Sequence, residues 1–327
     1  MSELMKAVVL DGPGDPSALK LRQVPRPVPQ PGWVLIQVKS FGLNRSELHF
    51  RRGMGSFGSF PRIPGIEATG VVVTAPGGEF EPGTQVVAIM GGMGRTIDGG
   101  YAEYVSVPAE IVIPFRSELS WEALGALPEM VQTANGSLQV GVGAQAGDTL
   151  LIRGGSSAVG LAATALAKHA GIKVISTTRN PAKTDQLHAA GAEYVIIDDG
   201  EIFEKVREIC PDGVNGAIEL IGTNTLPDTL KATAVHGTVC FTGMLSDQWT
   251  IPDFYPMDYI PNGVRLTAYS GESSDLTAKS LQGIIDAVAA GELSFPMGHV
   301  YQLDEIVQAH EDMESGAVTG KLVVLNP

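Results

Sequence analysis

The order of apolar runs and helical segments between residues 149 and 243 restricts the fold of this chain most. Helical patterns at 157–170, 181–190, 201–209 and 225–234 separate the apolar runs, which lie at 149–155, 173–179, 194–198, 216–222 and 237–243. Strands that alternate with helices of this length form βαβ units, in which neighbouring strands run parallel. The sequence therefore predicts an α/β fold with a doubly wound parallel sheet in this region.

The first 115 residues have a different pattern. Short β-rich runs at 6–10, 33–43, 66–75, 84–90 and 101–108 are separated by turns rich in glycine and proline. This pattern predicts a β-barrel-type domain with little helix. Helical periodicity begins near Ser120, and the C-terminal part is predicted to hold helices near 274–290 and 304–315 before a last strand at 320–325.

Charge and cysteine content exclude several classes of protein. The formal net charge is −14, which disfavours nucleic acid and anionic membranes as partners. Cys210 and Cys240 lie too far apart to form a C-x-x-C pair, so a cysteine-rich zinc lobe is not expected. The first ten residues lack the apolar stretch of a signal peptide, and the run 158–167 is too short to span a bilayer. We expect a cytoplasmic protein.

The segment "RGGSSAVG" (153–160) joins the first predicted strand of the parallel sheet to its helix. Gly155 is expected to form the tight turn, Ser156 or Ser157 to cap the helix, and Gly160 to allow close packing. The N–H groups at the start of the helix, at Ala158 and Val159, would then face a pyrophosphate.

Ser157 stands where the G-x-G-x-x-G pattern has its middle glycine, and its hydroxyl is expected to bond phosphate. The alternative for this segment is a turn between strand and helix that binds no ligand.

The second strand of this sheet ends without an acidic residue. Folds that bind NAD usually have Asp or Glu there for the ribose hydroxyls, whereas this chain has Thr178 and Arg179, followed by Lys183. Two cations and no acid favour the 2′-phosphate of NADPH. Asp198 is an opposing charge near the adenosine end, and the alternative for Arg179 and Lys183 is an ordinary solvated surface.

Five segments resemble the medium-chain dehydrogenase/reductase superfamily in order and spacing, over essentially the whole chain. They lie at 41–53, 61–72, 99–108, 147–178 and 303–324. The resemblance implies a GroES-like catalytic domain at 1–120 and 266–327 and a Rossmann domain at 121–265. It also implies a nicotinamide in the cleft between them, and a homodimer in which the strand near 265–270 pairs across the interface.

The metal ligands of the zinc members of this superfamily are replaced. Asn44 stands at the position of their cysteine and Ile66 at that of their histidine, and residues 85–105 hold no cysteine. Asparagine is a poor zinc ligand and isoleucine cannot be one. The chain therefore resembles the zinc-free quinone oxidoreductase branch, and no metal is expected. Without a Lewis acid, reduction of an electrophilic acceptor is favoured over oxidation of an alcohol.

The resemblance also assigns residues to the reaction. Asn44 is expected beside the nicotinamide, where it contacts ribose or substrate, and His49 is a candidate proton or hydrogen-bond donor. Thr133 is expected near the nicotinamide ring, with Gly243 and Met244 at the edge of the cofactor. Each has an ordinary structural alternative: a turn, a packed histidine, a helical threonine.

Four further residues have two readings. Tyr101 and Trp249 are candidates for the wall of an acceptor pocket, with packing as the alternative. Glu47 and Arg51 have the spacing of an i,i+4 ion pair on a short helix, which we expect in preference to a catalytic role.

Three functions are compatible with these features. The leading hypothesis is an NADPH-dependent, zinc-independent reductase of quinones or activated, α,β-unsaturated carbonyls or alkenes. The second is an enoyl-thioester reductase, for which a basic patch formed by Arg45, Arg51, Arg52 and Arg62 would bind an acyl carrier. The third is a non-catalytic NADPH-binding protein, crystallin-like or regulatory.

Overall fold

The computed structural model describes residues 3–54, 58–316 and 318–326. The chain divides into two compact units. Unit 1 comprises Met1–Glu129, Glu272–Ala290 and Met297–Pro327, and unit 2 comprises Met130–Gly271 and Gly291–Pro296. Unit 1 thus holds both ends of the chain, and each unit is described below by itself.

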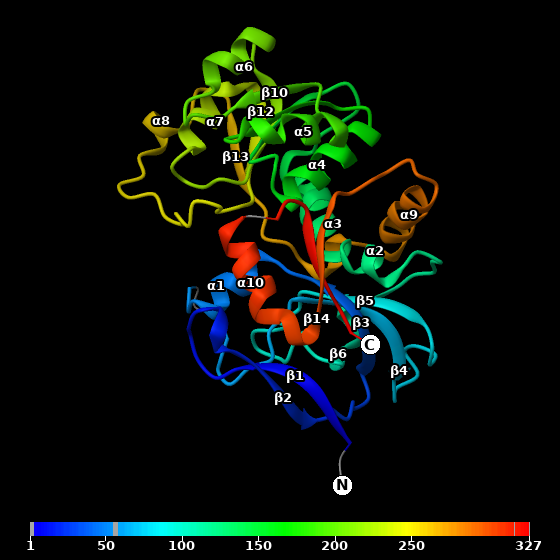
Figure 1. Ribbon diagram of the computed structural model, residues 1–327. Helices are drawn as coiled ribbons and strands as arrows, with labels where there is room; N and C mark the ends of the chain where they lie inside the picture. Colours follow the sequence, from blue (N-terminus) through cyan, green and yellow to red (C-terminus); the bar gives the residue numbers. More distant parts are fainter. Residues whose placement is uncertain (1–2, 55–57, 317, 327) are drawn as a thin grey trace. The chain divides into compact units, whose positions relative to one another are not determined.

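Unit 2 is built on a six-stranded parallel sheet with the order β10-β9-β8-β11-β12-β13. Figure 1 labels β10, β12 and β13 of this sheet. The sheet grows outward from β8 in one direction and from β11 in the other, which is the doubly wound order of the Rossmann fold. The α/β prediction is therefore confirmed. The strands are β8 (Thr149–Arg153), β9 (Lys173–Thr178), β10 (Tyr194–Ile197), β11 (Val214–Glu219), β12 (Thr233–Phe241) and β13 (Arg265–Ala268).

The helices of unit 2 pack in pairs, α4 with α5 and α6 with α7, and α4 and α7 contact the sheet. The core lies beneath them and contains Leu151, Ile175 and Val239, all fully buried. The helical segments are α3 (Pro128–Gly136), the π-helical turn η3 (Ser137–Val142), α4 (Ala158–His169), η4 (Pro181–Lys183), α5 (Thr184–Ala190), α6 (Phe203–Ile209), α7 (Leu226–Ala232) and α8 (Pro256–Tyr259).

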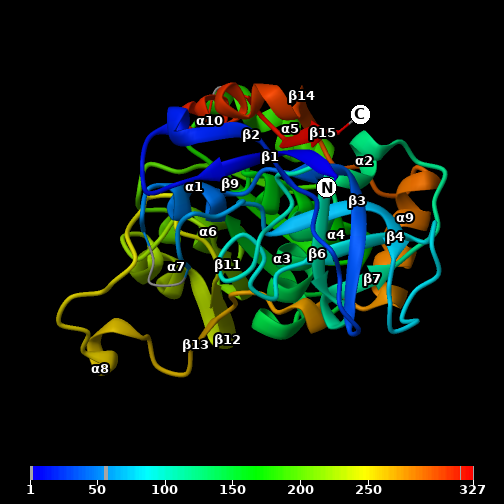
Figure 2. The ribbon, with the colours of Figure 1, turned by 90° about the horizontal axis from the view of Figure 1, so that it is seen from below.

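Unit 1 contains a mainly antiparallel sheet with the order β14-β15-β3-β4-β5-β7, to which β6 is added by pairing with β3 (Figure 2). A separate two-stranded sheet is formed by β1 and β2. The strands are β1 (Leu4–Leu10), β2 (Leu19–Pro25), β3 (Trp33–Gly42), β4 (Glu67–Thr74), β5 (Gln85–Ile89), β6 (Tyr104–Pro108), β7 (Val112–Pro114), β14 (Met297–Gln302) and β15 (Lys321–Leu325).

The last strand completes the sheet that the N-terminal part begins. β15 pairs antiparallel with β3, with Val324 opposite Phe41. Helix α2 packs on β3 and β15, and α10 packs against α1 and η1. The helical segments are η1 (Pro16–Ala18), α1 (Arg45–Arg51), η2 (Ala109–Ile111), α2 (Trp121–Gly125), η5 (Ser273–Asp275), α9 (Ala278–Ala289), η6 (Leu303–Glu305) and α10 (Ile306–Ser315).

Some strands were not expected from the sequence. The sequence shows no clear alternation of apolar and polar residues at β2, β7 and β14. β2, for example, pairs with β1 and is exposed at most of its positions, so it needs no apolar face. β13 spans the predicted domain limit at 265/266 and belongs to the six-stranded sheet of unit 2. The predicted domain limits, and the pairing of this strand across a homodimer, stay predictions.

The helices are short throughout the described residues. The longest, α4 and α9, have 12 residues each. Within those ranges no helix combines the length and the apolar character needed to cross a membrane.

Candidate functional site

The glycine-rich turn of unit 2 connects β8 to α4 through two glycines with different tasks. Gly154 has φ +86, a left-handed conformation that favours glycine, so the tight turn lies there and not at Gly155 as predicted. Gly155 allows a close approach instead: its N–H donates to Thr177 O at 2.9 Å, and a Cβ would lie 1.8 Å from Ser176 Oγ. The turn is therefore pressed against β9.

Ser157 is the N-cap of α4, one of the two residues expected to fill this position. Its Oγ accepts from the Gly160 N–H at 3.1 Å and donates to Gly154 O at 2.8 Å. The hydroxyl proton is thus used inside the turn, and the expected bond from Ser157 to a phosphate does not fit this arrangement. Gly160 is needed because a Cβ would lie 2.6 Å from Gly154 O.

The start of α4 offers other donors. In the described part of the chain, the N–H groups of Ala158 and Val159 donate to no protein acceptor. Both lie at the positive end of the helix dipole, where an anion is stabilised. The first turn of α4 therefore fits the phosphate cradle that the sequence predicts.

The end of β9 lies beside this turn. Thr178 Oγ1 and Ser156 Oγ are 3.2 Å apart. Arg179 follows directly and is exposed, and Lys183 lies half-buried four residues later. Neither side chain makes a hydrogen bond or an ion pair with any described residue. Arg179 is thus an uncommitted cation directly after the residue that contacts the turn, and Lys183 is a second uncommitted cation at the end of η4.

Asp198, the acid whose charge would disfavour NADPH, lies at the same sheet edge, but its charge is compensated by Arg153. Its N–H donates to Thr178 O at 2.9 Å. Its two oxygens accept from Arg153 Nε at 2.9 Å and Nη2 at 3.0 Å. Sequence reasoning missed Arg153, although a cation at the end of an apolar strand was a signal that it would need buried partners.

The remaining residues predicted for unit 2 lie near the ends of β11 and β12. Ser137 Oγ donates to Thr133 O at 2.7 Å and lies 2.9 Å from Thr242 Oγ1, which connects α3 to the residue before Gly243. Gly243 N–H donates to Glu219 O at 3.0 Å, and a Cβ on Gly243 would lie 2.7 Å from Leu220 O. Gly243 and Met244 thus follow the carboxyl end of β12, where ligands bind in folds of this type.

In unit 1, Asn44 belongs to a buried polar cluster. It caps α1 and is 6% exposed. Its Oδ1 accepts from Lys321 Nζ, and its Nδ2 donates to Glu67 Oε1 at 3.0 Å. Both ends of the amide are therefore engaged, and its orientation is set by two charged groups that are themselves almost fully buried.

The cluster is held together by opposite charges. Lys321 Nζ lies 3.4 Å from Glu67 Oε1 and 3.5 Å from Glu129 Oε2. Burial alone lowers the pKa of Lys321, but the two carboxylates raise it above its ordinary value, so it is charged. Burial raises the pKa of Glu67 while Lys321 opposes this. Glu67 and Lys321 were not predicted from the sequence. The one indication was that each is a charged residue at the start of an apolar strand, β4 and β15.

The predicted ion pair of Glu47 with Arg51 is wrong. The Glu47 carboxylate accepts from the N–H groups of Asn44 and Ile66, both at 2.9 Å. Arg51 instead pairs with Glu314 of α10. The i,i+4 rule assumes an exposed helix face, whereas both side chains are buried here. Burial raises the pKa of Glu47 to about 7, against the opposing charge of Arg95.

The histidine and tyrosine expected near the acceptor are both buried. His49 lies within α1 and is 7% exposed. Tyr101 is fully buried, stacks on Phe41 with ring centroids 4.6 Å apart, and lies 3.1 Å from His310 Nε2 through its hydroxyl. For Tyr101 these contacts favour the packing alternative.

The arginines expected to form a basic patch are mostly paired. Arg51 and Arg52 both bond Glu314, the second at 2.9 Å. Arg62 pairs with Asp98 at 3.0 Å. Because the charges of these three arginines are compensated, they do not supply the free positive surface that an acyl carrier would need.

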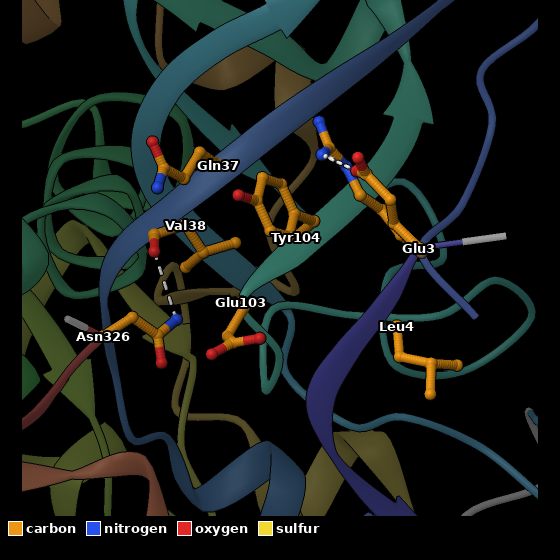
Figure 3. Close-up of a pocket in the computed structure, with 8 residues that line it drawn as sticks. Glu3, Leu4, Gln37, Val38, Glu103, Tyr104 and Asn326 are labelled. Atoms are coloured by element: carbon orange, nitrogen blue, oxygen red, sulfur yellow. Dashed lines mark hydrogen bonds and ion pairs between the residues drawn. The ribbon is translucent and has the colours of Figure 1, made fainter. Parts of the chain in front are cut away.

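A hollow of about 500 Å³ lies on unit 1 beside Tyr104 and Asn326 (Figure 3). Two of its charged side chains pair within the wall: Arg26 Nη1 bonds Glu3 at 2.6 Å, and its guanidinium lies over the Tyr104 ring. Asn326 Nδ2 donates to Val38 O at 3.2 Å. None of the residues predicted for the site lines this hollow, so it is not part of the candidate site.

Two family models match the chain. The alcohol dehydrogenase GroES-like domain matches residues 30–117, and the zinc-binding dehydrogenase model matches residues 158–292. The chain belongs to the medium-chain dehydrogenase/reductase superfamily.

Relatives extend over the full length. The chain is 29% identical to the quinone oxidoreductase of Mus musculus, over 99% of this chain and 98% of that protein. It is similar to the quinone oxidoreductase structure from Coxiella burnetii, with 26% identity, a TM-score of 0.83 and coverage of 99% and 100%. A mycobacterial protein solved in complex with NADPH has 27% identity, a TM-score of 0.86 and coverage of 98% and 100%.

The name of the second family model raises the question of a catalytic zinc. At the two positions that the resemblance pairs with zinc ligands, the Asn44 amide is engaged by Lys321 and Glu67, and the Ile66 side chain has no donor atom. Within the ranges that the structure describes, no group of three or more His, Cys, Asp or Glu could hold a metal ion. The donor set at these positions therefore does not fit zinc.

The close approach at Gly155 predicts the effect of one methyl group. Gly155→Ala is expected to destabilise the protein by about 2–3 kcal/mol, because the new Cβ overlaps Ser176 Oγ. Adding Ser176→Ala should recover most of this loss, since the Ser176 hydroxyl has no hydrogen-bond partner among the described residues. Urea unfolding of the single and double variants measures both effects; equal losses in the two would contradict the contact.

The buried cluster predicts a second stability effect. Lys321→Met should lower the free energy of unfolding by about 3–5 kcal/mol, because it leaves Glu67 buried without its counter-charge. The double variant Lys321→Met/Glu67→Gln should be more stable than Lys321→Met. Chemical denaturation tests this, with Lys279→Met on the exposed face of α9 as the control; a double variant less stable than the single would contradict the assignment.

Proposed function

We propose that this protein is an NADPH-dependent, zinc-independent reductase that transfers hydride to a quinone or to an activated, α,β-unsaturated carbonyl or alkene. One observation carries the proposal. Arg179 and Lys183 are uncommitted cations at the end of β9, beside a glycine turn whose helix N–H groups are also uncommitted. This combination fits a dinucleotide with an additional phosphate on its adenosine ribose.

The neutralisation of Asp198 by Arg153 supports the same nucleotide. An open carboxylate at this edge would favour ribose hydroxyls over a phosphate. Here both carboxylate oxygens are bound to a guanidinium. The similarity to a mycobacterial protein solved with NADPH points in the same direction.

The proposed division of work follows from the residues of each unit. In unit 2, the N–H groups of Ala158 and Val159 would hold the pyrophosphate. Thr178, Arg179 and Lys183 would lie on the adenosine ribose side, and Thr133, Gly243 and Met244 toward the nicotinamide. Bound NADPH supplies the hydride.

Residues of unit 1 would act on the acceptor. We assign Asn44 a hydrogen bond to substrate or ribose and His49 the donation of a proton or hydrogen bond. The Asn44 amide is held by Lys321 and Glu67, so it is oriented before any ligand binds. Its Nδ2 already faces Glu67, Glu47 and Gly42, whereas its Oδ1 keeps a second lone pair that could accept from a ribose or substrate hydroxyl.

The activity is tested by mixing the protein with NADPH and a panel of quinones and enones and following the loss of nicotinamide absorbance. We expect turnover with at least one acceptor, and no loss of rate after treatment with a zinc chelator. Enoyl thioesters belong in the panel, because exclusive turnover of these would favour a thioester reductase. Tight NADPH binding with no turnover of any acceptor would refute the enzyme and leave a binding protein.

The phosphate site gives a separate prediction. Arg179→Ala should weaken NADPH binding about 10- to 100-fold, the loss of one charge-assisted hydrogen bond, and leave NADH binding nearly unchanged. Lys173→Ala is the matched control, because Lys173 is an exposed cation at the opposite end of β9. Titrations followed by fluorescence measure both affinities; equal loss for the two nucleotides would contradict the assignment.

A further inference from the structure

Arg153 is the last residue of β8 and is fully buried, directly before the two glycines of the turn. Every nitrogen of its guanidinium is used. Nε and Nη2 bond the two oxygens of Asp198, and Nη2 also donates to Gly200 O at 2.9 Å. Nη1 donates to Asp228 Oδ2 at 2.6 Å, to Thr225 O at 3.0 Å and to Thr229 Oγ1 at 3.1 Å.

Asp198 connects this group to the edge where the nucleotide is proposed to bind. It follows β10 and bonds Thr178 O through its N–H. Its Oδ2 also accepts from Thr177 Oγ1 at 3.3 Å, and that hydroxyl accepts from the Gly154 N–H at 3.1 Å. Arg153, Asp198, Thr177 and the glycine turn therefore form one continuous network.

Asp198 carries its charge in this network. Burial raises the pKa of the carboxyl, but the hydrogen bonds and the charge of Arg153 lower it below its ordinary value. An ionised carboxylate next to Thr178 and Arg179 would repel a phosphate there by an energy worth roughly a factor of ten in affinity. Arg153, held on the interior side of Asp198, compensates this charge without occupying the phosphate position.

Asp228, the other acidic partner of Arg153, is held by a different element and not by the end of β9. Its oxygens also accept from the N–H groups of Ile202 and Phe203 at 2.9 and 3.3 Å, so it is held by the start of α6. Glu219 is likewise held by Thr229 at 2.5 Å and Thr225 at 3.0 Å. Asp198 is thus the partner of Arg153 that borders the end of β9.

We propose that Arg153 is a specificity-determining residue of the dinucleotide site: it holds Asp198 turned inward and compensated, so that the edge beside Arg179 accepts a 2′-phosphorylated adenosine. This inference rests on the proposed NADPH function and concerns the discrimination of NADPH from NADH. Arg153 acts through Asp198 and the turn, so it is a positioning residue and not a catalytic one.

The test compares NADPH and NADH binding by direct titration of four proteins: wild type, Arg153→Met, Asp198→Asn and the double variant. Arg153→Met should reduce the preference for NADPH about tenfold, because Asp198 is left ionised and uncompensated. The double variant should regain the wild-type preference within about threefold, since it lacks both charges. If Arg153 had a structural role alone, Arg153→Met would weaken the binding of both nucleotides equally. The double variant would then not change the ratio of NADPH affinity to NADH affinity.

Asp198→Asn keeps the test decisive if Arg153→Met does not fold, because asparagine still accepts a bond from Arg153. A preference within about twofold of wild type supports the inference, since the replaced charge was already compensated. A gain in NADPH preference of about tenfold would overturn it, because Asp198 would then act on the phosphate despite Arg153. Wild-type protein that does not bind NADPH would instead refute the proposed function.

Discussion

The contact between the glycine turn and β9 is the constraint on which the rest of the candidate nucleotide site depends. Gly155 lies so close to Ser176 and Thr177 that even a methyl group would overlap the Ser176 hydroxyl. This contact brings Ser156 to Thr178 and sets the start of α4 beside the end of β9. A phosphate cradle and a ribose site have to be neighbours to hold one dinucleotide, and here a single close backbone approach makes them so.

Each unit contains one buried cation that fixes the orientation of the polar side chains around it. Lys321 lies among Asn44, Glu67 and Glu129 in unit 1, and Arg153 lies between Asp198 and Asp228 in unit 2. A buried ion pair adds little net stability, because both charges lose their hydration. Its effect here is to orient other groups: the Asn44 amide in one unit and the edge of the parallel sheet in the other.

The sequence predicted what depends on local pattern. The order of strands and helices in unit 2, the cap at Ser157 and the need for Gly160 follow from periodicity and turn chemistry, and the structure confirms them. Partners distant in sequence were missed, since Arg153 and Asp198 are 45 residues apart and Lys321 and Asn44 are 277 apart. The expected pair of Glu47 with Arg51 failed because spacing does not reveal burial.

Arg179 and Lys183 are candidates for binding an anion because they are unpaired, whereas several other basic residues are paired with carboxylates. On a chain with a net charge of −14, a basic residue is readily satisfied by a nearby carboxylate, as Arg51, Arg62 and Arg153 are. Arg179 directly follows Thr178, which contacts the glycine turn. Arg179 and Lys183 both remain unpaired among the described residues, while the charge of Asp198 is compensated from the interior. An acidic protein that reserves two cations at one sheet edge is arranged to receive an anion there.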